Sequence, residues 1–225
     1  YRRQRQMCIR DRITTDGIVK TYAGAAQNSG SIDSAVASGA RFSNPTGIVA
    51  DSTGNLYVMD SGNYTIRRIT SAGSVTTIAG SAGFSGSSNG TGSVARFSKA
   101  YGMALQSGTL YVADTANNKI RKVILSSGSV QAVAGNGLAG ATDNVPYSIA
   151  QFNQPTGVAV DSAGNVFVAD SGNHKIRKLT ASTSTVSTFA GSGAQGAADG
   201  PGLSATFTYP TGLYIDSSDN LYVTS

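Results

Sequence analysis

Four stretches of this chain are nearly the same sequence, spaced 55 residues apart. They begin KAYG at Lys99 in one copy and NPTG, QPTG and YPTG at Asn44, Gln154 and Tyr209 in the others. A short aromatic signature precedes each copy (ARFS, ARFS, AQFN and ATFT). A chain that repeats itself in this way folds as similar units that pack against their neighbours.

Each unit predicts four short strands, a to d in chain order, joined by tight turns. In the first unit they span residues 47–50, 56–59, 65–70 and 74–79, where β-branched and aromatic residues concentrate. Between them, Gly and Asn supply the positive φ of tight turns, and Asp supplies a capping oxygen. A Gly/Ser/Ala-rich connection then leads to the next unit. We expect one or two short helical turns at most.

Four antiparallel strands in every repeat, without helical periodicity, are typical of the radial blades of a β-propeller. We therefore predict an all-β fold with four-stranded antiparallel blades near residues 45–79, 100–134 and 155–190, and half a blade at 210–225. The segment from Arg12 to Gly24 ends like the other units and predicts outer strands of an earlier, incomplete blade.

The repeated motif P-T-G-[IV]-x-[AV]-D-S-x-G-N-[LV]-[YF]-V-[MA]-D-S-G-N-x-x-I-R-[RK]-[IL] resembles the NHL repeat. The resemblance covers residues 13–225 and implies a six-bladed propeller of the kind found in bacterial NHL repeat-containing proteins. Six such units need about 330 residues, so we expect about four repeats of a longer protein. The second unit departs from the motif, with Ala100-Tyr101 in place of Pro-Thr. The fourth has Thr224-Ser225 where the first has Met59-Asp60.

The head of the chain, YRRQRQMCIRDR, differs from the repeats. The chain has 17 Lys+Arg against 12 acidic residues, all Asp, and five of the arginines lie in this head together with Cys8. The head resembles a translated sequencing adapter, so we expect residues 1–12 to be non-native or disordered. A natural basic arm that binds polyanions is the alternative. Without the head the chain is nearly neutral, and residues 13–225 contain no cysteine for a disulfide framework.

Two aspartates recur in the units, one after strand a and one after strand b. A metal-binding interpretation is possible, but residues that recur in every blade serve the blade, so we interpret them as structural turn residues. The set after strand a is Asp51, Asp161 and Asp216, and the set after strand b is Asp60, Asp114 and Asp170. We expect the second set to pair with the strand-c arginines Arg67, Arg121 and Arg177.

No catalytic constellation stands out in the sequence. His174 is the only histidine, Glu is absent, and a protein-built zinc site usually needs three His, Cys or carboxylate ligands. We predict no catalytic residue, metal ligand or cofactor here, although a divalent metal in a longer protein stays open. No apolar run is long enough for a membrane-spanning helix.

Nucleic-acid binding is also disfavoured. Strand c is basic in each unit, and animal NHL proteins resemble RNA binders with a positive face. However, the recurring aromatic residue of strand b is expected in the core and not as a base-stacking platform. These aromatic residues are Tyr57, Tyr111, Phe167 and Tyr222.

Antiparallel order places the b–c turns and the long connections on one face, and the a–b and c–d turns on the other. The connections vary while the strands stay alike, and binding sites favour variable loops on a rigid scaffold. We therefore predict the binding face at the b–c turns, with the residues Asn63, Tyr64, Asn117, Asn118, Asn173 and His174.

These observations favour a non-enzymatic binding or scaffold propeller whose partner is a protein, a peptide or a glycan. The resemblance also implies a propeller lyase or lactonase whose metal site lies in other blades, and RNA binding is a second alternative. Composition and resemblance favour an exported bacterial protein in an extracellular, periplasmic or cell-surface location.

Overall fold

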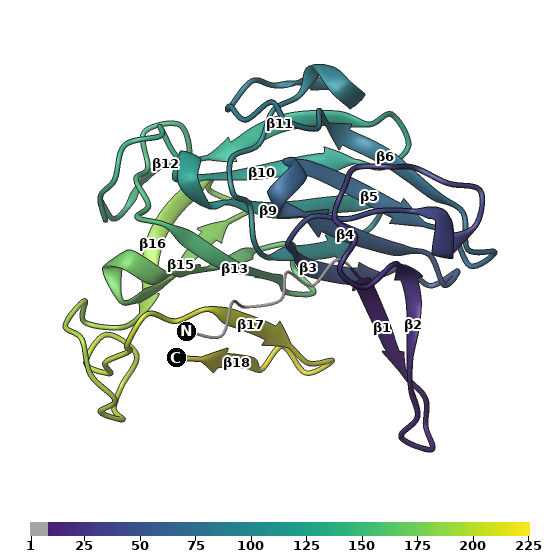
Figure 1. The fold of residues 1–225 in the computed structure, drawn as a ribbon. Coiled ribbons are helices and arrows are strands. Elements are labelled where there is room, and N and C mark those ends of the chain that lie inside the picture. The colour runs from purple at the N-terminus through teal and green to yellow at the C-terminus, as the bar shows by residue number, and fades with distance from the viewer. Residues whose placement is uncertain (1–8) are drawn as a thin grey trace, which may run out of the picture. The chain divides into compact units, whose positions relative to one another are not determined.

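The computed structural model describes residues 9–225, so residues 1–8 of the predicted head lie outside the described part. The chain divides into two compact units, Tyr1–Lys99 and Ala100–Ser225. All regular elements of the described residues are strands or single 3-10 turns (Figure 1). The predicted all-β class with four-stranded antiparallel blades is confirmed.

The first unit contains one complete blade. It consists of β3 (Pro45–Ala50), β4 (Leu56–Asp60), β5 (Thr65–Ile69) and β6 (Val75–Gly80), which pair antiparallel in that order. Each strand lies within two residues of its predicted bounds. A two-residue strand, β7 (Gly90–Thr91), follows in the connection.

A hairpin of β1 (Ile9–Ile13) and β2 (Val19–Gly24) precedes this blade. It is the predicted pair of outer strands, because its VKTYAG strand matches β6. The strand β1 starts at Ile9, so residues 9–12, which we expected in a non-native or disordered head, form a strand in the structure.

The second unit contains two complete blades. The first has β8 (Met103–Gln106), β9 (Thr109–Asp114), β10 (Lys119–Ile124) and β11 (Ser129–Ala134). The next has β13 (Pro155–Val160), β14 (Val166–Asp170), β15 (Lys175–Thr180) and β16 (Thr185–Ala190). All neighbouring strands pair antiparallel.

A half blade and an extra edge strand complete the second unit. The half blade is the hairpin of β17 (Gly212–Ile215) and β18 (Leu221–Thr224). The short strand β12 (Val145–Pro146), from the long connection, pairs with the outer strand β16. The connection before a blade therefore runs along that blade's outer edge.

Alternating apolar residues form the cores within and between blades. In the first unit, Phe42 of the ARFS signature packs with Val58, Ile69 and Val75, and all four are buried. In the second unit, Val158, Val166 and Val168 contribute to a core with residues of the preceding blade. Full burial of one such side chain stabilises the fold by about 1.5–3 kcal/mol.

The half blade explains one wrong prediction. Tyr57 and Phe167 are buried as predicted, but Tyr222 is 57% exposed. The hairpin β17–β18 packs one face on the preceding blade through Leu213 and Val223. Its other face carries Tyr222, and the described residues place no further blade against it.

The structure contains five 3-10 turns, more than the one or two helical turns that we expected. They are η1 (Ala37–Gly39), η2 (Ser61–Asn63), η3 (Gly92–Val94), η4 (Thr115–Asn117) and η5 (Ser171–Asn173). Three of them are the b–c turns, and each of these ends at a residue in the left-handed conformation. The D-S-G-N sequence is therefore a short helical turn and not a simple reverse turn.

Candidate functional site

The two edges of each blade carry different turns, as predicted. On one edge, the c–d turn contacts the a–b turn, because the Ser71 and Ala181 amides donate to the side-chain oxygens of Asn55 and Asn165. On the other edge, the b–c turn contacts the connection that precedes the blade, since Gly62 N–H donates to Ser43 O. We call the first the turn edge and the second the loop edge.

On the turn edge, the carboxylates of the aspartates bind only nearby residues. Asp51 accepts hydrogen bonds from the backbone amides of Thr53 and Asn55 and from the Asn55 carboxamide, at 2.8–2.9 Å. The Asn55 side-chain hydrogen bond is the main cause that lowers the pKa of Asp51. Asp161 and Asp216 bind Asn165 and Asn220 in the same way. These contacts cap a tight turn.

On the loop edge, the aspartates are fully buried and paired with arginine. The Asp60–Arg67, Asp114–Arg121 and Asp170–Arg177 pairs measure 3.1, 2.9 and 3.1 Å, and both side chains of each pair are 0% exposed. Burial raises the pKa of Asp60, and it raises the pKa of Asp170 to about 6, although hydrogen bonds and the arginine act in the opposite direction. The expected ion pairs are confirmed.

The sequence analysis missed a second acidic partner of the buried arginines. Arg67 also binds Asp33, and Arg177 also binds Asp143 at 3.1 Å. Both aspartates lie in the long connection and also bind the outer strand, where Thr188 Oγ1 donates to Asp143 at 2.6 Å. A usable signal exists in the sequence, because each lies nine residues before the Phe of its aromatic signature.

The buried arginine also collects backbone carbonyls from the connection. Arg177 donates to Thr142 O at 2.6 Å and to Gln151 O at 3.2 Å. Its guanidinium lies 5.7 Å from the ring centre of Phe152, the aromatic residue of the signature. One buried side chain therefore fastens two separate segments of the connection to the blade.

Three residues of the predicted binding face belong to this network. Asn63 donates to Asp60 and to Gly30 O, and Asn173 donates to Asp170 and to Gly140 O, all at 2.7 Å. Asn117 donates to Asp114 at 2.8 Å. These carboxamides join the turn to its loop and point into the blade.

The other three residues, Tyr64, Asn118 and His174, occupy one equivalent position. Each ends its b–c turn in the left-handed region, with φ of 60°, 50° and 55°. This conformation costs most residues about 1–2 kcal/mol, so the network must impose it. The side chain at this position changes while its backbone does not.

A further set of left-handed residues was missed by the sequence analysis. The residue before strand a has a φ between 43° and 50° in all four repeats and is exposed in each. These residues are Asn44, Lys99, Gln154 and Tyr209. They begin the next blade on the loop edge, so they belong to the same surface as the b–c turns.

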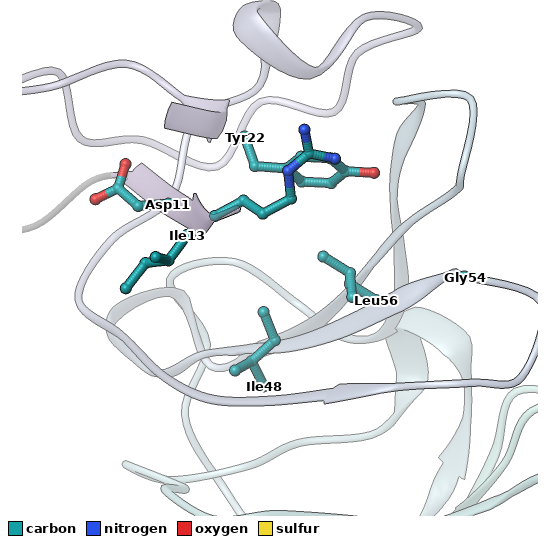
Figure 2. Close-up of a pocket in the computed structure, with 7 residues that line it drawn as sticks. Asp11, Ile13, Tyr22, Ile48, Gly54 and Leu56 are labelled. Atoms are coloured by element: carbon teal, nitrogen blue, oxygen red, sulfur yellow. The ribbon is translucent and has the colours of Figure 1, made fainter. Parts of the chain in front are cut away.

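An open groove lies in the first unit, with a volume of about 440 Å³. Figure 2 shows Ile13 and Tyr22 of the β1–β2 hairpin on one side and Ile48 and Leu56 of β3–β4 on the other. Ile48 is 47% exposed, whereas its counterpart Val158 is 4% exposed because β13 packs on β8 and β9. The groove therefore corresponds to a packing position between blades.

The described residues 9–225 hold no group of three His, Cys, Asp or Glu side chains placed to bind a metal ion. His174, which we considered as a ligand or general base, accepts a hydrogen bond from Tyr209 N–H and packs against the Tyr209 ring. No helix in the described part of the chain is long and apolar enough to cross a membrane.

Comparison with known sequences supports the repeat assignment. The NHL repeat model matches residues 42–69 and 152–179. Protein SUPPRESSOR OF QUENCHING 1, chloroplastic, of Arabidopsis thaliana is 33% identical over 121 residues, which are 50% of this chain and 11% of the relative. Human NHL repeat-containing protein 2 is 39% identical over 87 residues, 39% of this chain and 12% of the relative. The chain thus spans about a tenth of these relatives.

Solved structures share the fold. An auxiliary nutrient binding protein from Bacteroides thetaiotaomicron has a TM-score of 0.71 at 16% identity, over 98% of this chain and 51% of that one. Virginiamycin B lyase from Staphylococcus aureus has a TM-score of 0.56 at 18% identity, over 95% and 55%. Successive four-stranded antiparallel blades and these likenesses define a β-propeller fold. Two of the chain's repeats match the NHL repeat model, and the fold is that of a β-propeller.

Proposed function

We propose that this chain is a non-enzymatic binding propeller whose loop edge presents variable side chains to a protein, peptide or glycan partner. One observation carries the proposal. The same buried Asp–Arg network holds the b–c turn and its loop in successive blades, while the half-buried position at the end of the turn changes from Tyr64 to Asn118 to His174. A fixed backbone with changing side chains is the arrangement of a recognition surface.

The long connections also expose apolar side chains on this surface. Leu138 is 64% exposed and lies beside Gly137, whose carbonyl accepts a hydrogen bond from the Asn118 carboxamide. The aliphatic part of Lys119 approaches the same glycine. The loop edge thus combines amide, aromatic, aliphatic and cationic groups, which suits contact with a polar partner.

The test compares substitutions on the two edges. The double variant Tyr64→Asn/His174→Asn keeps a residue that tolerates the left-handed conformation, and blade two already has Asn at this place. The control is Ser52→Ala/Ala163→Ser on the turn edge. We expect a ligand from a glycan array or a peptide library to bind the wild type and the control and to bind the loop-edge variant at least tenfold more weakly. Binding lost only in the control would overturn the proposal.

The alternative functions have their own discriminating measurements. A stoichiometric, tightly bound divalent metal in the purified protein favours a lyase-like or lactonase-like enzyme. RNA binding is favoured if a variant that lacks residues 1–12 binds RNA and if this affinity falls steeply as the salt concentration rises. The similarity to virginiamycin B lyase that is reported above is a similarity of fold.

We also propose an extracellular, periplasmic or cell-surface location for a bacterial protein of this kind. The support is the surface rich in Ser, Thr, Asn and Gly, together with the likeness to bacterial auxiliary nutrient binding proteins. Fusion of the complete gene's N-terminus to a secretion reporter tests the proposal, and a purely cytosolic signal would contradict it.

A further inference from the structure

Successive blades of the second unit meet at a repeated contact on the loop edge. The Asn118 side-chain oxygen accepts a hydrogen bond from Gln154 N–H at 2.9 Å, and the His174 Nδ1 atom accepts one from Tyr209 N–H at 3.2 Å. In both cases the last residue of a b–c turn binds the first residue of the next blade. We call these two pairs the inter-blade steps.

At the second step, two aromatic rings are fixed against each other. The rings of His174 and Tyr209 lie edge to face, with centroids 4.6 Å apart and an interplanar angle of 70°. Tyr209 nevertheless remains 55% exposed. The contact therefore orients an aromatic surface toward solvent, which removes the entropy cost of ordering that ring when a ligand binds.

The hydrogen bond also sets the chemistry of the imidazole. A neutral histidine whose Nδ1 accepts a hydrogen bond carries its proton on Nε2, so Nε2 is a donor. At the first step, the exposed Gln154 carboxamide supplies both a donor and an acceptor. The two steps thus present neutral polar groups beside an aromatic ring.

The acidic groups of the loop edge do not contribute charge to this surface. Asp114 and Asp170 lie on the same turns but are 0% exposed and paired with arginines. Lys119 and Lys175 follow the turn ends and are the cationic groups beside the steps. The four side chains of the steps themselves match a ligand that has many hydroxyl groups, no net charge and flat C–H faces. A sugar ring has these features, because its C–H face stacks on an aromatic ring and its hydroxyls hydrogen-bond to amides.

From this arrangement we infer that the inter-blade steps Asn118–Gln154 and His174–Tyr209 form a binding site for a neutral oligosaccharide. The Tyr209 ring stacks on one sugar unit, while His174 Nε2 and the Gln154 carboxamide bind hydroxyl groups. This inference rests on the proposed binding function and narrows its partner class to carbohydrate.

Affinity electrophoresis of the full chain tests the inference. Native gels contain soluble starch, xylan, galactomannan or mixed-linkage β-glucan, and a separate gel contains polygalacturonate. We expect at least one neutral polysaccharide to retard the wild type. Tyr209→Asn should weaken that retardation about tenfold, the scale of a lost aromatic contact, because Asn44 shows that Asn fits this position. Tyr209→Phe, which keeps the ring, should retain most of the binding.

The matched control is Tyr214→Asn, since Tyr214 is also exposed, at 66%, but lies on β17 away from the steps. Thermal melts check folding, and His174→Asn provides a second variant if Tyr209→Asn unfolds. Equal retardation of wild type and Tyr209→Asn, retardation by polygalacturonate alone, or no retardation in any gel would overturn the inference. A peptide ligand that depends on Tyr64 and His174 would then leave the proposed binding function standing without the carbohydrate.

Discussion

The two edges of a blade use the same residue type in opposite ways. On the turn edge, Asp51 binds only residues within six positions of itself and keeps contact with solvent. On the loop edge, Asp60 is fully buried and binds Ser43 and Arg67, which lie 17 and 7 positions away. The comparison shows that a recurring aspartate can serve local turn geometry or long-range assembly, depending on the partners within its reach.

The largest expected effect follows from removal of a buried arginine. Arg177→Ala leaves Asp170 buried without its cation and frees two loop carbonyls, so we expect a loss of about 3–5 kcal/mol in the free energy of unfolding. Urea denaturation measures this loss. The control Lys178→Ala changes the next residue of the same strand and should cost about 1 kcal/mol or less. Similar losses in both variants would mean that the network does not hold the loop edge together.

A smaller effect should separate the two aspartates of one blade. Asp60→Asn removes the buried charge that faces Arg67, while Asp33 still binds the arginine, so we expect a loss of about 2–3 kcal/mol. Asp51→Asn keeps part of the turn's hydrogen bonding and should cost clearly less than Asp60→Asn. Thermal unfolding of both variants gives the ranking. The reverse order would show that local turn contacts matter more than the buried pair.

A further difference between the two edges concerns the pH dependence of stability. Burial raises the pKa of Asp170 from 3.8 to about 6, so the folded chain binds this proton more tightly than the unfolded chain. Its contribution to stability is present in full below pH 4 and is lost as the pH rises through about 6, with a slope of at most about 1.4 kcal/mol per unit. Asp170→Asn should flatten the stability curve between pH 4 and 6, as followed by chemical denaturation.

The contribution of Asp51 to stability should change with pH in the opposite direction. Its pKa is lowered, first by the Asn55 side chain, so its contribution is present above about pH 4 and is lost as the pH falls below that value. Asp51→Asn should therefore change the curve only in strong acid. A change between pH 4 and 6 in this variant would contradict the assignment of that interval to Asp170.

The blades could be predicted from the sequence because the residues that specify each strand and turn lie close together in the chain. Alternation and turn residues place β3 to β6 within two residues, and the repeat extends the prediction to the second unit. The Asp60–Arg67 pair was also predictable, since both residues lie on adjacent strands. Register fixes such neighbours once the strands are known.

The remaining features depend on contacts across long sequence separations. Arg177 and Asp143 are 34 residues apart, and only the nine-residue spacing from Asp143 to Phe152 marks Asp143 as a partner. The inward direction of the Asn63 and Asn173 side chains depends on loop carbonyls that are 33 residues away. Gln154 and Tyr209 have a left-handed backbone although neither is glycine, so their residue types do not predict this conformation. Tertiary contacts impose it.

The inter-blade hydrogen bond also limits what engineering can change at the turn ends. A replacement at position 118 or 174 must tolerate positive φ and place an acceptor near the next amide, which Asn and His both do through the first heteroatom beyond Cγ. A library at these sites should therefore begin with Asn, Asp, His and Ser. Position 154 or 209 takes part in this hydrogen bond through its backbone N–H, so its side chain has to tolerate positive φ but need not supply the acceptor. At each blade boundary, the residue that ends the turn is therefore the more constrained position. The residue before the next strand accepts more side chains in the design of new binding specificities.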